Sequence, residues 1–209
     1  FALSTSNGWS SLDFQIKNGG AVTTISAVGI AIENGWHHIA ATYNSISGMK
    51  IYVDGNFINS TGVTGGLASN AQQLTIGAQH DGAGSADSDY SNFFNGNIDE
   101  LRIWNVERTL AQIRYTKDTP LEGNEVGLAA YYQFNQGTVG GNNSSISSVT
   151  ESVNGLNAAW PIATAFDLSG STSNFVTSYD NAPAAPSSFG GIVLAVTGGS
   201  NSYIYEWYK

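Results

Sequence analysis

Short stretches in which hydrophobic and polar residues alternate recur along the chain and are separated by Gly and Asn. The clearest stretch is Trp36–Tyr43, which turns Ile39, Ala41 and Tyr43 to one face of a predicted strand. A second stretch, Met49–Asp54, alternates in the same way after a short polar turn. Many short strands of this kind, joined by turns, are typical of an antiparallel β-sandwich.

Turn and helix signals divide the rest of the chain. Asp54 and Gly55 tolerate the positive φ of a tight hairpin turn, so they predict a hairpin here. Thr109, with Gln112 three residues later, forms the capping-box pattern of a short helix. The stretch 80–95 is polar, without periodicity, and is predicted to be a long loop. Further strands are predicted at Phe1–Leu3, Gln73–Ala78, Asn97–Trp104, Leu128–Phe134, Ala158–Ile162 and Ser173–Val176.

The chain divides into three parts on this evidence. Residues 1–178 are predicted to form an all-β, two-sheet antiparallel jelly-roll sandwich, whose upstream strands we expect to precede this sequence. Residues 179–189 carry Pro183 and Pro186 among Ala and Ser, which indicates a semi-stiff linker. Residues 190–209 alternate again, and we expect them to begin another β-module.

Composition and charge exclude several functions. Seven Lys and Arg against 16 Asp and Glu give a net charge of −9, which disfavours nucleic acids and anionic membrane surfaces as partners. No apolar run approaches the length of a membrane span. Cysteine is absent, as in many bacterial exported or cytosolic proteins. An acidic surface suits a divalent cation or a neutral, polyhydroxylated ligand.

Four motifs in order carry a family resemblance. Gly35–Tyr43 and Ile51–Gly55, followed by Leu74–Gly77 and Phe94–Asn105, resemble the central strands of laminin G-like jelly rolls in the concanavalin A-like lectin class, to which pentraxins are related. The resemblance covers about residues 1–135 and implies the sandwich fold expected above.

Weaker similarities lie in the flanking segments. Leu128–Asn135 and Ser169–Val176 are similar to segments of cell-surface proteins of the Bacteroidota, and Val196–Trp207 resembles the start of Ig-like repeats in their large adhesins. The resemblance implies a protein that is secreted to the bacterial cell surface, through the type IX route, with components of the secretion machinery as partners during export.

A candidate Ca²⁺ site lies in the long polar loop. Ca²⁺ binds six to eight oxygens from carboxylates, amides and carbonyls. The loop supplies such oxygens from Gln79, Asp81, Asp87, Asp89 and Asn92. In pentraxin-like relatives the calcium loop follows the same Ile-Gly strand; Gln79, Asp81 and Asn92 match its ligand positions, whereas His80 departs from the pattern. The alternative is a loop of solvated acids.

Other chemistry-bearing residues favour structural roles. Asp99 and Glu100 are adjacent on a predicted strand and point to opposite faces, so they do not form a glycosidase pair; Arg102 is expected to partner a carboxylate. The histidines (His37, His38 and His80) are expected to be structural rather than zinc ligands. Four aromatic residues are candidates for stacking on sugar rings, but core packing is the favoured interpretation for each: Trp9, Trp104, Tyr131 and Tyr132.

The function favoured by these observations is that of a non-catalytic module. We expect it to bind a carbohydrate or another surface ligand within a secreted, multidomain bacterial adhesin, with Ca²⁺ as a candidate cofactor. The alternatives are a structural spacer or docking domain of a large surface protein, and an accessory module of a secreted hydrolase. Fold alone does not choose among them.

Overall fold

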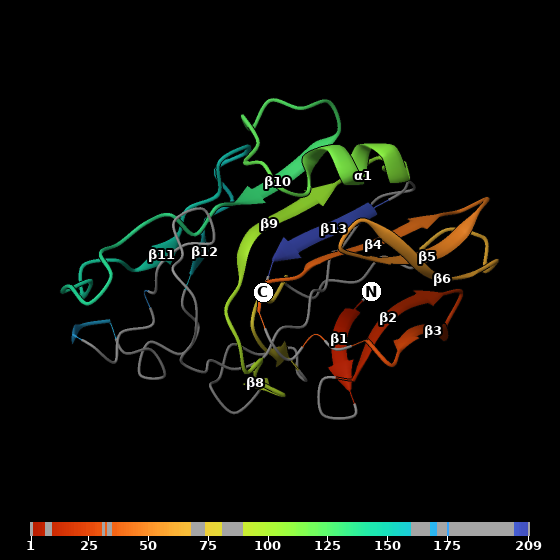
Figure 1. Ribbon diagram of the computed structural model, residues 1–209, viewed down its shortest axis with the longest axis horizontal. Helices are drawn as coiled ribbons and strands as arrows, with labels where there is room; N and C mark the ends of the chain where they lie inside the picture. Colours follow the sequence, from red (N-terminus) through yellow and green to blue (C-terminus); the bar gives the residue numbers. More distant parts are fainter. Residues whose placement is uncertain are drawn as a thin grey trace.

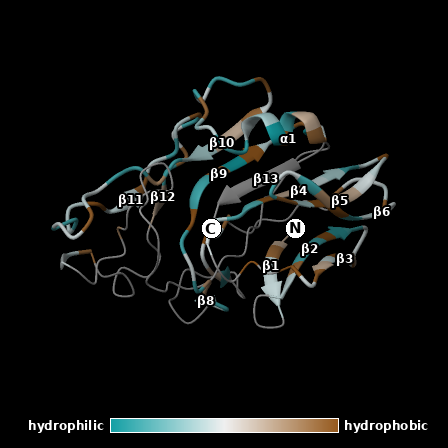
Figure 2. Cartoon of the chain, viewed as in Figure 1, coloured by the Kyte–Doolittle hydropathy of each residue, from teal (hydrophilic) through white to brown (hydrophobic). Residues whose placement is uncertain are grey.

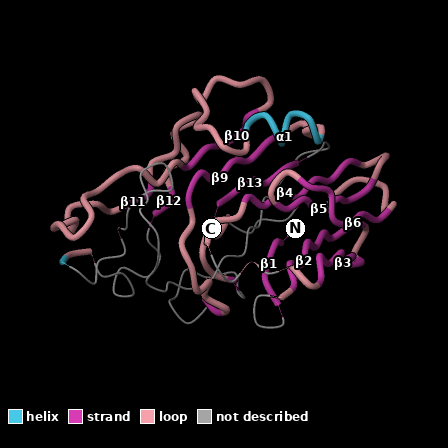
Figure 3. Tube along the Cα trace, in the orientation of Figure 1, coloured by secondary structure: helices cyan, strands magenta, loops and turns pink. Residues whose placement is uncertain are grey.

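The computed structural model describes residues 2–6, 10–30, 32, 35–67, 74–80, 90–159, 168–170, 175 and 203–208. This part of the chain is mostly β, with antiparallel sheets and one short α-helix (Figures 1 and 3). The predicted antiparallel jelly-roll sandwich is therefore confirmed. The elements are β1 (Ala2–Ser6), β2 (Ser11–Asn18), β3 (Ala21–Val28), β4 (His38–Asn44), β5 (Gly48–Val53), β6 (Asn56–Thr61), β7 (Gln79–His80), β8 (Tyr90–Ser91), β9 (Asp99–Trp104), α1 (Leu110–Thr116), β10 (Leu128–Tyr132), β11 (Ser148–Val149), β12 (Ala158–Ala159) and β13 (Tyr203–Tyr208).

Six strands form the main sheet, in the order β10-β9-β13-β4-β5-β6, and every neighbouring pair is antiparallel. At its centre the predicted hairpin of β4 and β5 pairs Ala41 with Ile51. Asp54 and Gly55 connect β5 to β6 with φ angles of 51° and 71°. Positive φ at both positions is the geometry of a tight hairpin turn, as their sequence predicts.

The main core lies between the main sheet and the three-stranded sheet β1-β2-β3. Ile39, Ala41 and Tyr43 all contribute to it, so the predicted inward face of β4 is confirmed. Figure 1 shows the three-stranded sheet as a separate layer beside β4, β5 and β6. The two layers are also joined by a hydrogen bond of 2.8 Å from Asn59 Nδ2 in β6 to the Ser26 carbonyl oxygen in β3.

A second hydrophobic core covers the opposite face of the main sheet. It is built from the side chains of Ala40, Tyr52, Trp104, Ile113, Leu121, Leu128 and Tyr131. Helix α1 supplies Ile113 and lies beside β9 and β10 (Figure 1). The helix begins with the predicted capping box, in which Thr109 and Gln112 each accept a hydrogen bond from the other's backbone N–H. Both faces of the main sheet are therefore packed.

The last described strand, β13, belongs to the main sheet. It lies in residues 190–209, which are predicted to begin an Ig-like module, and it pairs along its whole length with β4 and also with β9. Local alternation predicts that a strand forms, but it cannot say which strands it pairs with. The linker at 179–189 and residues 190–202 lie outside the described residues, and the Ig-like character of that segment stays a prediction.

The strand predicted at Gln73–Ala78 is also corrected. Among residues 74–78 there is no strand, and pairing begins only at Gln79 in β7. Leu74 and Ile76 still pack against the main core, which accounts for the alternation seen in the sequence. Gly77 has a φ of 89°, which interrupts an extended strand at this point.

A substitution in the main core tests which residues of the strands face inward. Ile51 is fully buried in β5, so replacing it by Ala is expected to lower the free energy of unfolding by about 2–5 kcal/mol through lost burial and a cavity. Ile46, 85% exposed in the β4–β5 turn, is the matched control and should change stability by less than about 0.5 kcal/mol when replaced by Ala. Urea denaturation measures both; equal effects would contradict the assigned faces.

Candidate functional site

The base of the predicted calcium loop is formed by a two-stranded ladder. β7 pairs with β8 through Gln79 opposite Ser91 and His80 opposite Tyr90. The ladder is extended by a hydrogen bond of 3.0 Å from the Phe94 backbone N–H to the Gly77 carbonyl oxygen. It brings together the two ends of the segment 81–89, which itself lies outside the described residues.

Two of the five predicted calcium-loop residues meet at this base. Asn92 Nδ2 donates a hydrogen bond of 2.7 Å to Gln79 Oε1. Asn92 has a φ of 48°, a left-handed conformation that Asn adopts more readily than most residues. Amide oxygens are ligands that Ca²⁺ accepts, so the donor types at the base fit that ion.

The remaining three predicted residues, Asp81, Asp87 and Asp89, lie outside the described residues, and their side chains are not placed. Within the described part of the chain no three His, Cys, Asp or Glu side chains gather as a metal site would require. Of the five predicted residues, the structure therefore places only Gln79 and Asn92, and both the calcium site and the ion stay predictions.

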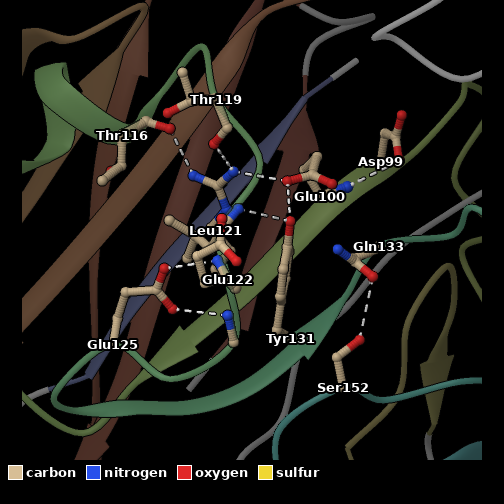
Figure 4. Close-up of polar contacts among 12 residues, drawn as sticks. Asp99, Glu100, Thr116, Thr119, Leu121, Glu122, Glu125, Tyr131, Gln133 and Ser152 are labelled. Carbon is tan, nitrogen blue, oxygen red and sulfur yellow. Dashed lines mark hydrogen bonds and ion pairs between the residues drawn. The ribbon is translucent and has the colours of Figure 1, made fainter.

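A second polar cluster is buried beneath α1 and centres on Arg102, whose exposed fraction is 0%. Its guanidinium donates to Glu100 Oε2 at 2.7 Å and to the carbonyl oxygens of Thr116 and Thr119 at 2.8 and 2.6 Å. Figure 4 shows Thr116, at the end of α1, and Thr119, in the segment that follows, on one side of the cluster and Glu100 of β9 on the other. The prediction that Arg102 partners a carboxylate is confirmed.

Tyr131 completes this cluster from β10. Its hydroxyl donates to Glu100 Oε2 and accepts a hydrogen bond of 3.1 Å from the Leu121 backbone N–H (Figure 4). Burial, followed by the hydrogen bond to Glu100, raises the pKa of Tyr131 to about 12. The phenol therefore stays protonated and acts as a donor. The cluster ties β9, β10 and the segment 116–121 together.

The paired acids of β9 are held in the fold. Glu100 Oε2 is shared between Arg102 and Tyr131, and Asp99 Oδ1 accepts a hydrogen bond of 3.0 Å from the Glu100 backbone N–H. Glu100 has a φ of 56°, so it interrupts the regular alternation on which the sequence-based argument relied. In Figure 4 the Glu100 carboxylate points toward the Tyr131 hydroxyl. Their contacts describe a structural role.

The remaining candidate residues that the structure describes, three aromatic residues and His37, have packing or structural roles. Trp104, Tyr131 and Tyr132 are all buried, so the core-packing interpretation is confirmed for these three aromatic residues. Figure 2 shows hydrophobic residues along β9 of the main sheet, whereas much of the loop backbone is hydrophilic. His37 Nδ1 lies 2.8 Å from Asp54 Oδ2, a structural contact at the β5–β6 turn. Trp9 lies outside the described residues.

The sequence-based reasoning missed Glu151. Its carboxylate, 3% exposed, accepts hydrogen bonds from the backbone N–H groups of Tyr131, Val153, Asn154 and Leu156 at 2.6–3.3 Å. Burial alone would raise the pKa of Glu151, but these four donors outweigh it and lower the pKa. The only sequence signal was an acid just before an Asn-Gly turn. The residue fastens the segment 151–156 to β10.

Comparison with known proteins matches slightly more than half of the chain to one family. Residues 1–114 match the family Laminin_G_3, described as the concanavalin A-like lectin/glucanases superfamily. The chain is also 28% identical over 144 residues to the rat (Rattus norvegicus) protein "Sushi, von Willebrand factor type A, EGF and pentraxin domain-containing protein 1". That alignment covers 67% of this chain and 4% of the relative. No solved structure matches the chain.

Proposed function

We propose, on the premise that the chain belongs to the Laminin_G_3 family of the concanavalin A-like lectin/glucanases superfamily, that it is a non-catalytic ligand-binding module. The superfamily name covers both lectins and glucanases, so the acids of this chain decide between binding and hydrolysis. A glycosidase needs two carboxyl groups flanking one bond. Glu100 is instead buried against Arg102 and Tyr131, which supports binding without catalysis.

The observation that carries the proposal is the contact between Gln79 and Asn92. It sets two amides at the base of a loop whose sequence contributes Asp81, Asp87 and Asp89. We propose that these five residues hold Ca²⁺ and that the ligand, a glycan or another surface ligand, binds at this loop. When bound, the ion would supply a cationic centre for the hydroxyl oxygens of a sugar. The relative's name includes a pentraxin domain, which agrees with this proposal.

We further propose that the module works outside the cell, as part of an adhesin-type surface protein of the Bacteroidota exported by the type IX route. The acidic charge and the absence of cysteine are compatible with this location. No helix in the described part of the chain has the length and apolarity needed to cross a membrane. Fractionation of the source cells, with antibodies against residues 1–114, tests the location.

A spacer or docking role is the second candidate function. It is favoured by the packing of both faces of β4, β5, β9 and β10, because the cores on each side leave these strands no open face for a ligand, and only β6, at the edge of the sheet, is exposed among the described strands of the main sheet. If the loop binds nothing, the sandwich still suits a rigid spacer.

Ca²⁺ dependence is the first test of the binding function. We expect about 1–5 mM Ca²⁺ to raise the melting temperature relative to chelator, since extracellular modules bind the ion with dissociation constants of roughly 10⁻⁴ to 10⁻³ M. Asn92→Ala and Asp87→Ala should abolish this shift. Asn56→Ala, which removes an exposed amide from β6, is the matched control and should retain it. A melting temperature that is unchanged by the ion would remove Ca²⁺ from the proposal.

Ligand class is tested on a glycan array in Ca²⁺ and in chelator. The binding module is expected to retain one class of glycan in Ca²⁺, and Asn92→Ala is expected to lose it. Asn56→Ala should bind like the unmodified chain. If no glycan or surface-protein ligand is retained under either condition, the spacer function is favoured instead.

A further inference from the structure

Asn is followed by Gly at five places in the sequence, at 7–8, 18–19, 34–35, 95–96 and 154–155. In such a pair the backbone nitrogen of Gly attacks the side-chain amide carbon of Asn. The reaction is favoured before Gly because Gly has no side chain to hinder the approach and allows the backbone to turn. The structure describes both residues in three of the five pairs, which begin at Asn18, Asn95 and Asn154.

Asn18 is held by its side chain and by its backbone. Its Nδ2 donates a hydrogen bond to the Thr64 carbonyl oxygen, and its backbone pairs with Ala21 at the end of the β2–β3 ladder. The turn between them has positive φ angles of 56° at Gly19 and 97° at Gly20. The side chain therefore has to leave Thr64 before its amide carbon reaches the Gly19 nitrogen.

Asn154 is exposed to solvent but is held in the same way. Its Nδ2 donates a hydrogen bond of 2.8 Å to the Ala129 carbonyl oxygen in β10. Its backbone N–H donates another, of 2.6 Å, to the Glu151 carboxylate. Both the side chain and the backbone of Asn154 are therefore fixed, although water reaches the residue.

Asn95 differs from both. It is exposed and belongs to no helix or strand, since it lies in the segment 92–98 that joins β8 to β9 (Figure 1). Within the described part of the chain, neither the Asn95 side chain nor the Gly96 backbone N–H forms a hydrogen bond. The two reacting groups therefore approach each other without first breaking such a bond.

We propose that Asn95 is the preferred deamidation site among these three Asn residues. The Gly96 nitrogen forms a bond to the Asn95 side-chain carbon, the amide leaves as ammonia with the proton of the Gly96 N–H, and a cyclic succinimide results. Water then opens the ring at either carbonyl and gives aspartate or isoaspartate in place of Asn95. The reaction consumes water, releases ammonia and requires no enzyme or oxidant.

Deamidation adds one negative charge to a chain whose net charge is −9. The new carboxylate lies three residues after Asn92 and next to Phe94, whose N–H is bonded to the Gly77 carbonyl oxygen at the base of the β7–β8 loop. Isoaspartate also lengthens the main chain by one carbon atom at this point. The reaction therefore modifies the base of the loop proposed to bind the ligand, but it does not depend on that function.

Deamidation rates of the folded and the unfolded full chain test the proposal. The chain is incubated in mildly alkaline buffer with and without denaturant, and conversion at Asn18, Asn95 and Asn154 is quantified by mass spectrometry of the digested protein. Each folded rate is divided by the denatured rate of the same residue, which removes the effect of neighbouring side chains. This ratio is expected to be about two to ten times lower for Asn18 and Asn154 than for Asn95, the factor that corresponds to one net hydrogen bond.

Asn95→Gln is the matched variant, because Gln keeps the amide but cyclises with the next backbone nitrogen much more slowly. It should lower the fraction of acidic species that ion-exchange chromatography resolves in the incubated folded chain. Asn56→Gln, which changes an exposed amide that does not precede Gly, should leave this fraction unchanged. The proposal is overturned if folding slows Asn95 as much as it slows Asn18 or Asn154, or if Asn95→Gln does not lower the acidic fraction.

Discussion

Replacing Arg102 by Met is expected to lower the free energy of unfolding by about 3–5 kcal/mol. Arg102 is fully buried, and its removal leaves the Glu100 carboxylate without a charge partner inside the protein. The carbonyl oxygens of Thr116 and Thr119 lose their donors at the same time. Breaking one half of a buried pair is costly because the remaining charge is neither paired nor solvated.

Two further variants separate the effect of the unpaired buried charge from that of losing an ion pair near the surface. Lys50→Met breaks the 2.6 Å ion pair between Lys50 and Glu107, whose two side chains are 28% and 22% exposed. Because this pair is partly solvated, the substitution should lower the free energy of unfolding by less than about 1 kcal/mol. Combining Arg102→Met with Glu100→Gln should recover part of the loss, because the second change removes the uncompensated charge. Urea denaturation measures all four proteins. An Arg102→Met effect no larger than that of Lys50→Met would show that the cluster does not hold the sheet.

The parts of the fold that the sequence predicts are those decided by local pattern. Ile39, Ala41 and Tyr43 alternate within one strand, β4, and the turn at Asp54 and Gly55 sets Val53 of β5 opposite Asn56 of β6. The capping box at Thr109 and Gln112 is equally local. In these segments, propensity, alternation and turn chemistry all favour the same structure, so the sequence suffices.

The parts that the sequence does not predict depend on distant partners. β13 has the alternation of a strand, but its pairing with β4 and β9 joins residues about 100 to 170 positions apart. Conversely, Leu74 and Ile76 pack against the core without forming a ladder, so their alternation suggested a strand that is absent there. Burial produces alternation both with and without strand pairing.

The candidate site was predictable only in part for the same reason. Gln79 and Asn92 were predicted as members of one site, and they are in contact across the β7–β8 ladder. Glu151 could not be found from pattern, because its role depends on backbone N–H groups, which every residue except proline has. The backbone of residues 153–156 turns around the Glu151 carboxylate, and such a turn produces no periodic pattern of hydrophobic and polar residues.

Replacing Glu151 by Gln is expected to destabilise the fold by at least about 2 kcal/mol near neutral pH, since hydrogen bonds to a charged acceptor contribute about 1.5–3 kcal/mol each and do not add fully. The amide has one acceptor oxygen and an NH₂ group that would face the donors of Tyr131, Val153 and Asn154. Glu125→Gln is the control: this half-buried carboxylate accepts two backbone hydrogen bonds within the described residues, from Glu122 and Gly123. Glu125→Gln should lower the free energy of unfolding by less than half as much as Glu151→Gln.

The pH dependence of the Glu151 effect follows from the direction of its pKa shift. The folded protein lowers the pKa of Glu151 below the ordinary value of 4.5, so folding favours the carboxylate form. The stability it contributes is therefore fully present above about pH 4.5 and is lost as the pH falls through the lower pKa of the folded state. Unfolding curves of the unmodified chain and Glu151→Gln, recorded from about pH 7 to about pH 3, should converge toward the acidic end. A stability difference that stays constant over this range would show that the charge of the carboxylate is not what fastens segment 151–156 to β10.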